Sequence, residues 1–518
     1  MHHAIMILSA DKIKQYVEQC NANDDALYVQ SIPNAKAAAF LSDNIPLFEC
    51  PDALFEQCYY FRWWTYRKHI RNTEDGYVIT EFLPPVRWAG KHNTISCAAG
   101  HHFYEGRWFQ DRRYLDDYAR FWLRKGGNPR QYSFWIADAL LAYVKVSGDK
   151  SLAVELLPEL VANYEAWERD HRDANGLFWQ VDDRDGMECS ISGKLSPDNK
   201  GYRATINSYM FGDAAAIAEI AIWANQNDLA HAYRLKAAEI KQLTEEILWD
   251  EKDSFFKVLP RVPNPNLADV RELHGYTPWY FNLPEQNKSI AWAQLMDPEG
   301  FYAPFGPTTA EQRHPEFTIT YEGHECMWNG PSWPFSTSIT LTALANLLNN
   351  YEQDTISKAD YFTMLRIYTK CHQRKREDGK ILPWIDENIN PYNGDWISRT
   401  RLKTWENGTW SQQKGGAERG KDYNHSTYND LIITGLVGLR PRTDDIVDIN
   451  PLLPPNTWDW FCLDQVNYHG RILTILWDKT GRKYGKGKGL RVLADGKTIA
   501  ASATLHGLHM ALPVVIPP

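Results

Sequence analysis

The stretch SYMFGDAAAIAEIAIWANQNDLAHAYRLKAAEIKQLTEEIL, residues 208–248, decides the fold class. Met210, Ala214 and Ile217 recur at intervals of three or four residues, so they form one apolar stripe of an α-helix. The pattern breaks at the polar run Asn-Gln-Asn-Asp, residues 225–228, and then resumes. Two amphipathic helices joined by so short a connection form an antiparallel helical hairpin.

The same helical period recurs along much of the chain. Further helices are predicted at 10–21, 109–124, 133–147, 150–169, 333–350, 356–372 and 425–437. Long segments rich in Gly, Trp, Asp and Asn separate them, at 76–108, 173–206, 296–332 and 376–424. Loops of this length are uncommon unless they carry function. The alternation predicts a toroid of paired helices with functional loops at one end, and the lack of a short repeat disfavours a solenoid.

The period changes from 3.6 to 2 after Arg440. The runs 471–477 and 490–494 alternate in polarity as strands do, and Asp495-Gly496 before the next run is a strong hairpin signal. The sequence therefore predicts three parts. These are an N-terminal extension packed on the barrel (1–52), a helical barrel (53–440) and a small β domain (441–518).

The bulk composition excludes several classes of partner. A net charge of -9 on 518 residues offers no basic excess to neutralise nucleic-acid phosphates or an anionic membrane. The 8 Cys are scattered without a CxxC pair, which implies neither a disulfide scaffold nor a zinc site. The apolar start is too short for a signal peptide and no segment is long enough to span a membrane. We expect a cytoplasmic location for the chain as given, and a periplasmic or secreted one if a leader was removed; the oligomeric state stays open.

Aromatic residues are unusually abundant, with 21 Trp, 27 Tyr and 20 Phe. Trp and Tyr present flat apolar faces with a polar tip, which suits the C–H faces and hydroxyl rims of sugars. A large core built from aromatic side chains is the alternative. Many of the Trp residues stand beside Gly, Asn, Pro, Asp or Glu, which favours a binding surface.

Four acidic residues fall within seven positions at 182–188, Asp-Asp-Arg-Asp-Gly-Met-Glu, shortly after the run Gly-Leu-Phe-Trp at 176–179. If these side chains face one site, their mutual repulsion raises the pKa of at least one of them and keeps it protonated near neutrality. A protonated carboxyl can act as a general acid. A solvated acidic loop and a calcium site are the alternatives, because oxygen clusters also bind calcium.

A second acidic and aromatic segment spans residues 384–396, Trp-Ile-Asp-Glu-Asn-Ile-Asn-Pro-Tyr-Asn-Gly-Asp-Trp. A base that activates water must keep its charge and lie near a face on which a sugar can stack. This segment offers both features, and a polar connection between helices is the alternative.

A third set of segments supplies donors, acceptors and stacking faces for sugar hydroxyls. Its candidate ligand residues are His101, His102, Glu105, Arg107, Trp108, Trp328, Asn329, Gly330 and Trp333. Adjacent His residues point in different directions, so His101 and His102 make a poor metal pair. Loop packing is the alternative for the set. His425, in the polar run 422–427, is either part of a helix N-cap cluster or a ligand contact.

These segments resemble motifs of the (α/α)6-barrel glycosidases, a group that includes the mannosylglycerate hydrolase-like enzymes, glycoside hydrolase family 63 and the trehalases. Those families carry an E-S-G-M/W-D segment whose last acid is the general acid. The segment 185–188, Asp-Gly-Met-Glu, resembles it with the two acids exchanged, which places Glu188 on the general acid and Asp185 on the preceding acid.

Three further motifs follow in the same order. The segment 205–209, with Asn207, matches an L/I-N-S type of sequence, and 327–333 resembles Y-W-R-G-P-V-W with Asn329 in place of the Arg. The segment 386–394 matches Y-E-x-Y/L-N-P-x-T-G and places Glu387 on the general base. The longer acid side chain and the missing Arg bear on the substrate more than on the reaction.

The resemblance implies a mainly α protein, an (α/α)6 toroid of the six-hairpin glycosidase type with a small C-terminal β-sandwich. It implies an exo-acting, inverting glycoside hydrolase that cleaves an α-glucoside or α-mannoside type of oligosaccharide. Glu188 would protonate the leaving oxygen and Glu387 would deprotonate the attacking water, with the two carboxyls about 6.5–9.5 Å apart. The subsites would be lined by Trp179, Trp328, Trp333 and Trp384. No cofactor is expected, with calcium near the acidic loops as the alternative.

Three other functions stay open. An arabinofuranosidase could use the same barrel and the same chemistry on a five-membered ring. A sugar epimerase or isomerase would abstract a proton with His101, His102 or His425. A carbohydrate-binding protein without catalysis would keep the pocket alone.

Overall fold

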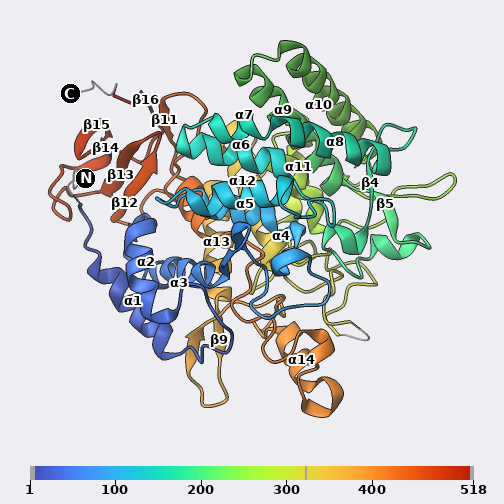
Figure 1. The fold of residues 1–518 in the computed structure, drawn as a ribbon, viewed down its shortest axis with the longest axis horizontal. Helices are drawn as coiled ribbons and strands as arrows, with labels where there is room; N and C mark the ends of the chain where they lie inside the picture. Colours follow the sequence, from blue (N-terminus) through green and yellow to red (C-terminus); the bar gives the residue numbers. More distant parts are fainter. Residues whose placement is uncertain (1–5, 321–323, 514–518) are drawn as a thin grey trace.

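The computed structural model describes residues 6–320 and 324–513, without the side chains of residues 405–407. Helices form the main body of the chain, and a C-terminal sheet lies beside it, near the N-terminal helices (Figure 1). A mainly α fold with a C-terminal β region is therefore confirmed. Within the described residues, none of the helices is both long and apolar enough to cross a bilayer.

The N-terminal segment contributes to both parts of the fold. Helices α1 (Asp11–Ala22) and α2 (Ala37–Asn44) pack on α3 (Ala53–His69), whose first turn is capped by the Asp52 carboxylate. Strand β1 (Leu47–Glu49) lies between α2 and α3 in the sequence and pairs antiparallel with the C-terminal strand β12. The first helix confirms the pattern at 10–21.

The predicted helical hairpin is confirmed by α9 (Ala204–Trp223) and α10 (Asn227–Ile247), which pack along each other. Asn225, in the connection, has a φ of 58°, a conformation that Asn tolerates better than most residues. The other helices of the body are α4 (Ser96–Gly106), α5 (Arg113–Arg124), α6 (Ile136–Ser147), α7 (Ser151–Glu155), α8 (Leu157–His171), α11 (Thr277–Tyr280), α12 (Pro334–Asn350), α13 (Lys358–Cys371) and α14 (Ile397–Gly408), with a π-helical turn at Leu431–Leu436.

Some sequence-based boundaries were wrong. Helix α4 lies inside the segment 76–108 that was predicted as loop, and α14 lies inside 376–424. Every residue of α4 except Tyr104 is buried, so its sequence has no polar face and therefore no amphipathic period. The single helix predicted at 150–169 is two helices, α7 and α8, with Leu156 between them.

The C-terminal sheet has five strands in the order β1-β12-β13-β14-β15. Its C-terminal strands are β12 (Trp460–Tyr468), β13 (Arg471–Asp478), β14 (Gly489–Ala494) and β15 (Lys497–Ser502). The predicted turn joins β14 to β15, and both Asp495 and Gly496 have the positive φ that a type I′ hairpin requires. A separate pair joins β11 (Ile446–Ile449) to β16 (Leu508–Ala511).

The described part of the helical body also contains four short antiparallel sheets. They are formed by β2 (Ile70–Thr73) with β3 (Gly76–Ile79), β4 (Trp179–Val181) with β5 (Lys200–Tyr202) and β8 (Leu259–Pro260), β6 (Trp249–Asp250) with β7 (Phe255–Phe256), and β9 (Gln373–Lys375) with β10 (Ile381–Pro383).

Much of the aromatic excess lies in the core rather than on a binding surface. The largest fully buried side chains include Trp63, Trp108, Trp122, Trp135, Trp167, Trp279, Trp292 and Trp333. The aromatic core that was the alternative interpretation therefore accounts for much of the composition, and the sugar-facing role falls to few rings.

Candidate active site

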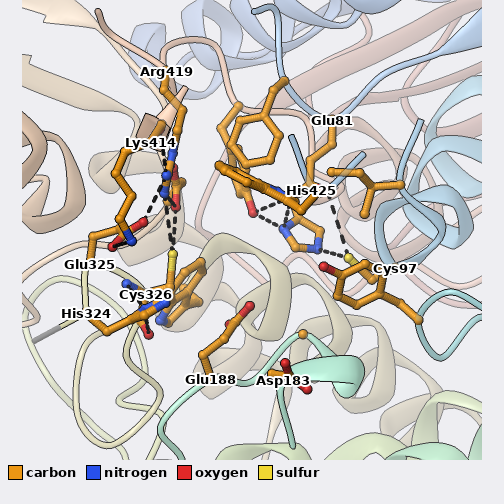
Figure 2. A pocket seen from close by; sticks show the side chains of 18 residues that line it. Glu81, Cys97, Asp183, Glu188, His324, Glu325, Cys326, Lys414, Arg419 and His425 are labelled. Atoms are coloured by element: carbon orange, nitrogen blue, oxygen red, sulfur yellow. Dashed lines mark hydrogen bonds and ion pairs between the residues drawn. The ribbon is translucent and has the colours of Figure 1, made fainter. Parts of the chain in front are cut away.

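A cavity of about 210 Å³ opens between the long loops of the helical body (Figure 2). Its lining is rich in charged and aromatic side chains. The lining residues are Glu81, Phe82, Trp88, Ile95, Cys97, Tyr132, Asp183, Gly186, Glu188, His324, Glu325, Cys326, Trp333, Glu387, Lys414, Arg419, Tyr423 and His425. The structure thus brings Glu188 and Glu387, which are far apart in the sequence, to one cavity.

Glu188 lies on one side of the cavity, beside Asp183 (Figure 2). None of the other side chains drawn in Figure 2 forms a hydrogen bond or an ion pair with its carboxyl group. Burial raises the pKa of Glu188 to about 8, and the negative charges of Asp183, Glu81 and Glu387 add to the shift. The raised pKa favours the protonated form of Glu188 near neutrality, and its main cause is burial rather than the repulsion within the acidic cluster on which the prediction rested.

The loop that carries Glu188 is anchored by its other acids. It leaves β4, forms a 3-10 turn at Asp182–Asp185 and returns through β5. The Asp182 carboxylate accepts hydrogen bonds from the Asp183 backbone N–H at 2.8 Å and the Ser190 hydroxyl at 3.1 Å. The backbone carbonyl of Glu188 accepts a hydrogen bond from the Trp328 N–H at 3.0 Å, which ties this loop to the segment 327–333.

Asp185 does not reach the cavity. Its carboxylate pairs with the Arg203 guanidinium at 2.8 Å, and it accepts hydrogen bonds from Ser133 at 2.5 Å and from Thr205. Asp185 and Arg203 both have fully buried side chains. The structure places Asp185, predicted as a catalytic residue, in an ion pair that holds the loop.

Asp185→Asn is therefore expected to destabilise the fold by roughly 3–5 kcal/mol, because it leaves the buried charge of Arg203 without its partner. Urea denaturation followed by fluorescence measures the change. Asp198→Asn is the matched control, because Asp198 pairs with Lys200 on the surface, where an ion pair contributes less than about 1 kcal/mol. Equal stability of the two variants would contradict the anchoring role.

Glu387 lies in a network of charges on another side of the cavity. Its two carboxylate oxygens accept hydrogen bonds from Nε and Nη2 of Arg419, at 2.8 and 2.9 Å. Such a bidentate pair fixes the orientation of the carboxylate. Nη1 of Arg419 also bonds Glu325 at 2.9 Å, and the Cys326 thiol donates to Glu387 at 3.1 Å. Burial opposes ionisation of Glu325, but the charge of Arg419 together with hydrogen bonds from the backbone and from Lys414 lowers the pKa of Glu325 to about 2.

The backbone around Glu387 explains how Arg419 comes so close. The Asp422 N–H donates to the Ile385 carbonyl at 3.1 Å, which ties the two loops together. A Cβ at Gly420 would lie 2.0 Å from the Asp386 carboxylate, so only Gly allows this approach. Burial and the neighbouring charge of Glu387 raise the pKa of Asp386 to about 7.

A third group of polar side chains forms another side of the cavity (Figure 2). His425 has Nδ1 at 3.0 Å from Glu81 and Nε2 at 3.3 Å from the Cys97 sulfur. The Tyr423 hydroxyl donates to Glu81 at 2.8 Å and also contacts the His425 ring. The position of His425 on the cavity favours the ligand contact over a helix cap.

Among the predicted stacking residues, Trp333 lines the cavity and Trp328 stacks behind it, with ring centroids 4.5 Å apart. Trp179 instead stacks on His171 and lies beneath the Arg261 guanidinium. Trp384 also lies away from the cavity, with the Arg374 guanidinium over its ring.

The predicted ligand residues near position 100 lie on α4 or directly after its last residue, and none of them lines the cavity. The ring of His101 is buried against aromatic side chains, and neither of its nitrogens is hydrogen-bonded within the described residues. His102 bonds the Asn424 carbonyl at 2.7 Å. Glu105 accepts bonds from backbone N–H groups before the π-helical turn, whereas Arg107 and Trp108 both donate to Asp430. These side chains support the loop of His425 rather than line the cavity.

Three other predicted ligand residues, Asn207, Asn329 and Gly330, contact the backbone of neighbouring loops. Asn207 bonds both the N–H and the carbonyl of Phe178. The Asn329 carbonyl accepts from the Thr318 N–H, and Gly330 lies so close to Thr318 that a Cβ would be 2.2 Å from its carbonyl oxygen. They hold loops in place around the cavity, which they do not line.

Sequence reasoning missed much of the lining, including Glu81, Trp88, Cys97, Tyr132, Glu325, Cys326 and Arg419. Cys326 directly precedes the segment 327–333 that was singled out, so proximity to that motif was an available signal. Arg419 lies in the long segment 376–424 that was predicted as loop, where no local pattern marks it. Its role comes from contacts to Glu387 and Glu325 that only the folded chain makes.

A cavity that brings one carboxyl group with a raised pKa together with one ion-paired carboxyl group holds the pair of acids on which glycoside hydrolysis depends. The chain matches the family model of the mannosylglycerate hydrolase MGH1-like glycoside hydrolase domain over residues 91–426, and it belongs to this family. The family resemblance inferred from the motifs is thereby confirmed. Residues 439–500 match the C-terminal domain of glycosyl hydrolase family 65.

Solved structures with a similar fold include a chain described as a sialidase. It is 44% identical with a TM-score of 0.89, and the match covers 97% of this chain and 44% of that one, so our chain spans less than half of its length. A GH78 family rhamnosidase of a Bacillus species is 14% identical with a TM-score of 0.52, over 87% of this chain and 41% of that one. The GH63 mannosylglycerate hydrolase of Thermus thermophilus is 14% identical with a TM-score of 0.50, over 72% and 98%.

Proposed function

We propose that this chain is an exo-acting, inverting glycoside hydrolase in which Glu188 is the general acid and Glu387 the general base. One observation carries the proposal: the two carboxyl groups line the same cavity in opposite electrostatic environments. Glu188 has a pKa raised to about 8 and no ion pair with the other side chains drawn in Figure 2, whereas Glu387 is paired with Arg419. A carboxyl group with a raised pKa that lies across a cavity from an ion-paired carboxylate is the arrangement expected of a general acid and a general base.

The reaction would run in one displacement. Glu188 transfers its proton to the glycosidic oxygen as the bond to the anomeric carbon breaks. Glu387 takes a proton from a water that attacks the opposite face of the ring, so the sugar is released with inverted configuration. This chemistry needs no metal, and the calcium considered for the acidic loops stays a prediction.

The cavity supports an exo mode of action. Its volume of about 210 Å³ is below the roughly 300–1,000 Å³ of pockets for drug-sized ligands, which fits one terminal sugar ring. Trp333 would supply the stacking face.

The charge of the cavity favours a neutral sugar. Among its described lining residues, carboxylates outnumber the cations Lys414 and Arg419, and Arg419 is already paired with Glu387 and Glu325. A sialic acid would bring another negative charge. A terminal α-glucosyl or α-mannosyl group is our first choice, with an arabinofuranosyl group as the alternative.

A screen of aryl glycosides and oligosaccharides tests this function. It should include glucosides, mannosides, arabinofuranosides, rhamnosides, sialosides and mannosylglycerate, with ¹H NMR following the anomer first released. We expect hydrolysis of one neutral class with inversion. Turnover with retention would contradict the proposed roles, and epimerised free sugar would favour an isomerase.

We further propose the (α/α)6 arrangement for residues 53–440, with 1–52 as an N-terminal extension and 441–518 as a β-sandwich. The family matches at 91–426 and 439–500 support a boundary near residue 440. The cytoplasmic location stays a prediction.

A further inference from the structure

Three side chains of different chemistry meet on the side of the cavity opposite the Arg419 network (Figure 2). Cys97 lies at the start of α4, Glu81 follows β3, and His425 precedes the π-helical turn. The Cys97 sulfur is 3.3 Å from Nε2 of His425 and 3.9 Å from Oε2 of Glu81. One ligand atom from each of the three residues lies within 4.8 Å of the others.

The orientation of His425 suits coordination. Its Nδ1 faces Oε1 of Glu81 at 3.0 Å, and Tyr423 contacts the same nitrogen, so the ring is held with Nε2 towards Cys97. In metal sites the second ring nitrogen of a ligating His is usually hydrogen-bonded, which fixes the tautomer; here the Tyr423 hydroxyl would keep that bond to Nδ1 when the Glu81 carboxylate turns to the metal.

We infer that Glu81, Cys97 and His425 form a Zn²⁺ site. Thiolate, imidazole and carboxylate are the ligand types of zinc, and three protein ligands leave a fourth position for water or substrate. All three residues line the cavity, so the fourth position faces the space where the sugar would bind. The excess of carboxylates on the cavity attracts a divalent cation.

Binding replaces a proton by the metal. The Cys97 thiol loses its proton to solvent as the S–Zn bond forms, since zinc binds the thiolate. Without the metal, the Cys97 thiol can instead donate a hydrogen bond to His425, and this bond competes with metal binding. The ligands are 16 and 328 residues apart, which explains why Cys spacing alone indicated no zinc site.

Metal titration of the full chain tests the site without reference to hydrolysis, so its failure would leave the proposed function untouched. After chelator treatment and dialysis, Zn²⁺ binding is measured by calorimetry and Co²⁺ binding by absorption. We expect one equivalent of metal, with a thiolate-to-cobalt charge-transfer band in the near ultraviolet. Zn²⁺ should also raise the Tm, because it binds the folded chain.

Cys97→Ser should abolish the charge-transfer band and weaken binding by at least about tenfold. Cys326→Ser is the matched control, because it removes the other thiol on the same cavity and should keep the band. Glu81→Gln keeps the size and shape of the side chain and removes its charge. It should weaken Zn²⁺ binding and change the Tm of the metal-free protein little. Substoichiometric binding to the wild type, or an unchanged band in Cys97→Ser, would overturn the site.

Discussion

Glu188→Gln should lower kcat by roughly 10²–10⁴-fold on substrates with a poor leaving group, because the amide cannot donate the proton that the leaving oxygen needs. In the wild type the pKa of Glu188 is raised to about 8, so the active, protonated form is lost as the pH rises through this value. We therefore expect kcat/KM of the wild type to fall above about pH 8, and the variant to lose this alkaline limb.

The same substitution should change stability in a pH-dependent way. Between the ordinary value of 4.5 and about 8, the folded protein holds a proton on Glu188 that the unfolded chain has released. Stability contributed by this group therefore declines as the pH rises through that interval and is constant above it. Gln has no such dependence, so the Tm of the variant relative to the wild type should increase with pH and then level off. A constant difference in Tm would show that Glu188 is not held protonated by the fold.

Glu387→Gln should also lower kcat by roughly 10²–10⁴-fold, for a different reason: water is then no longer deprotonated as it attacks. Because the charge of Glu387 also balances Arg419, the variant should be less stable, by up to roughly 3–5 kcal/mol. Steady-state kinetics and urea denaturation measure the two effects separately.

Arg419→Met combined with Glu387→Gln separates charge balance from catalysis. Removing both partners should recover part of the stability lost in the single variant, because the guanidinium that has lost Glu387 is then absent, while Lys414 remains as the ion-pair partner of Glu325. It should recover no activity. Asp444→Asn, which breaks an exposed pair with Arg442, is the control for a generic loss of charge. Activity above about one tenth of the wild-type level in Glu387→Gln would remove the base from its role.

The sequence was most informative where helices are amphipathic. The hairpin 208–248 could be predicted because its second helix, α10, has an exposed polar face beside its apolar stripe. The Asp495-Gly496 turn could also be predicted, because few residue pairs adopt two successive positive φ angles. Helix α4 was not predicted, because it is buried on nearly all sides and therefore lacks the apolar and polar periodicity from which helices are predicted.

Site residues divide along the same line. Glu188 and Glu387 stand in loops where acids and aromatics cluster locally, so their neighbours in sequence pointed to them. The proposed roles of Arg419 and Cys97 depend on contacts with residues that are distant in the sequence. Arg419 contacts Glu387, and Cys97 contacts His425. The high Trp content favoured a binding surface, but many of the Trp side chains are buried in the core.

Hydrolysis of a glycosyl fluoride tests the division of labour between the two carboxyls most directly. Fluoride leaves with little help from an acid, whereas water still needs a base. On the fluoride of the sugar identified by screening, Glu188→Gln should keep most of its turnover and Glu387→Gln should keep almost none. Equal losses in the two variants, or the reverse order, would contradict the assignment of acid and base across this cavity.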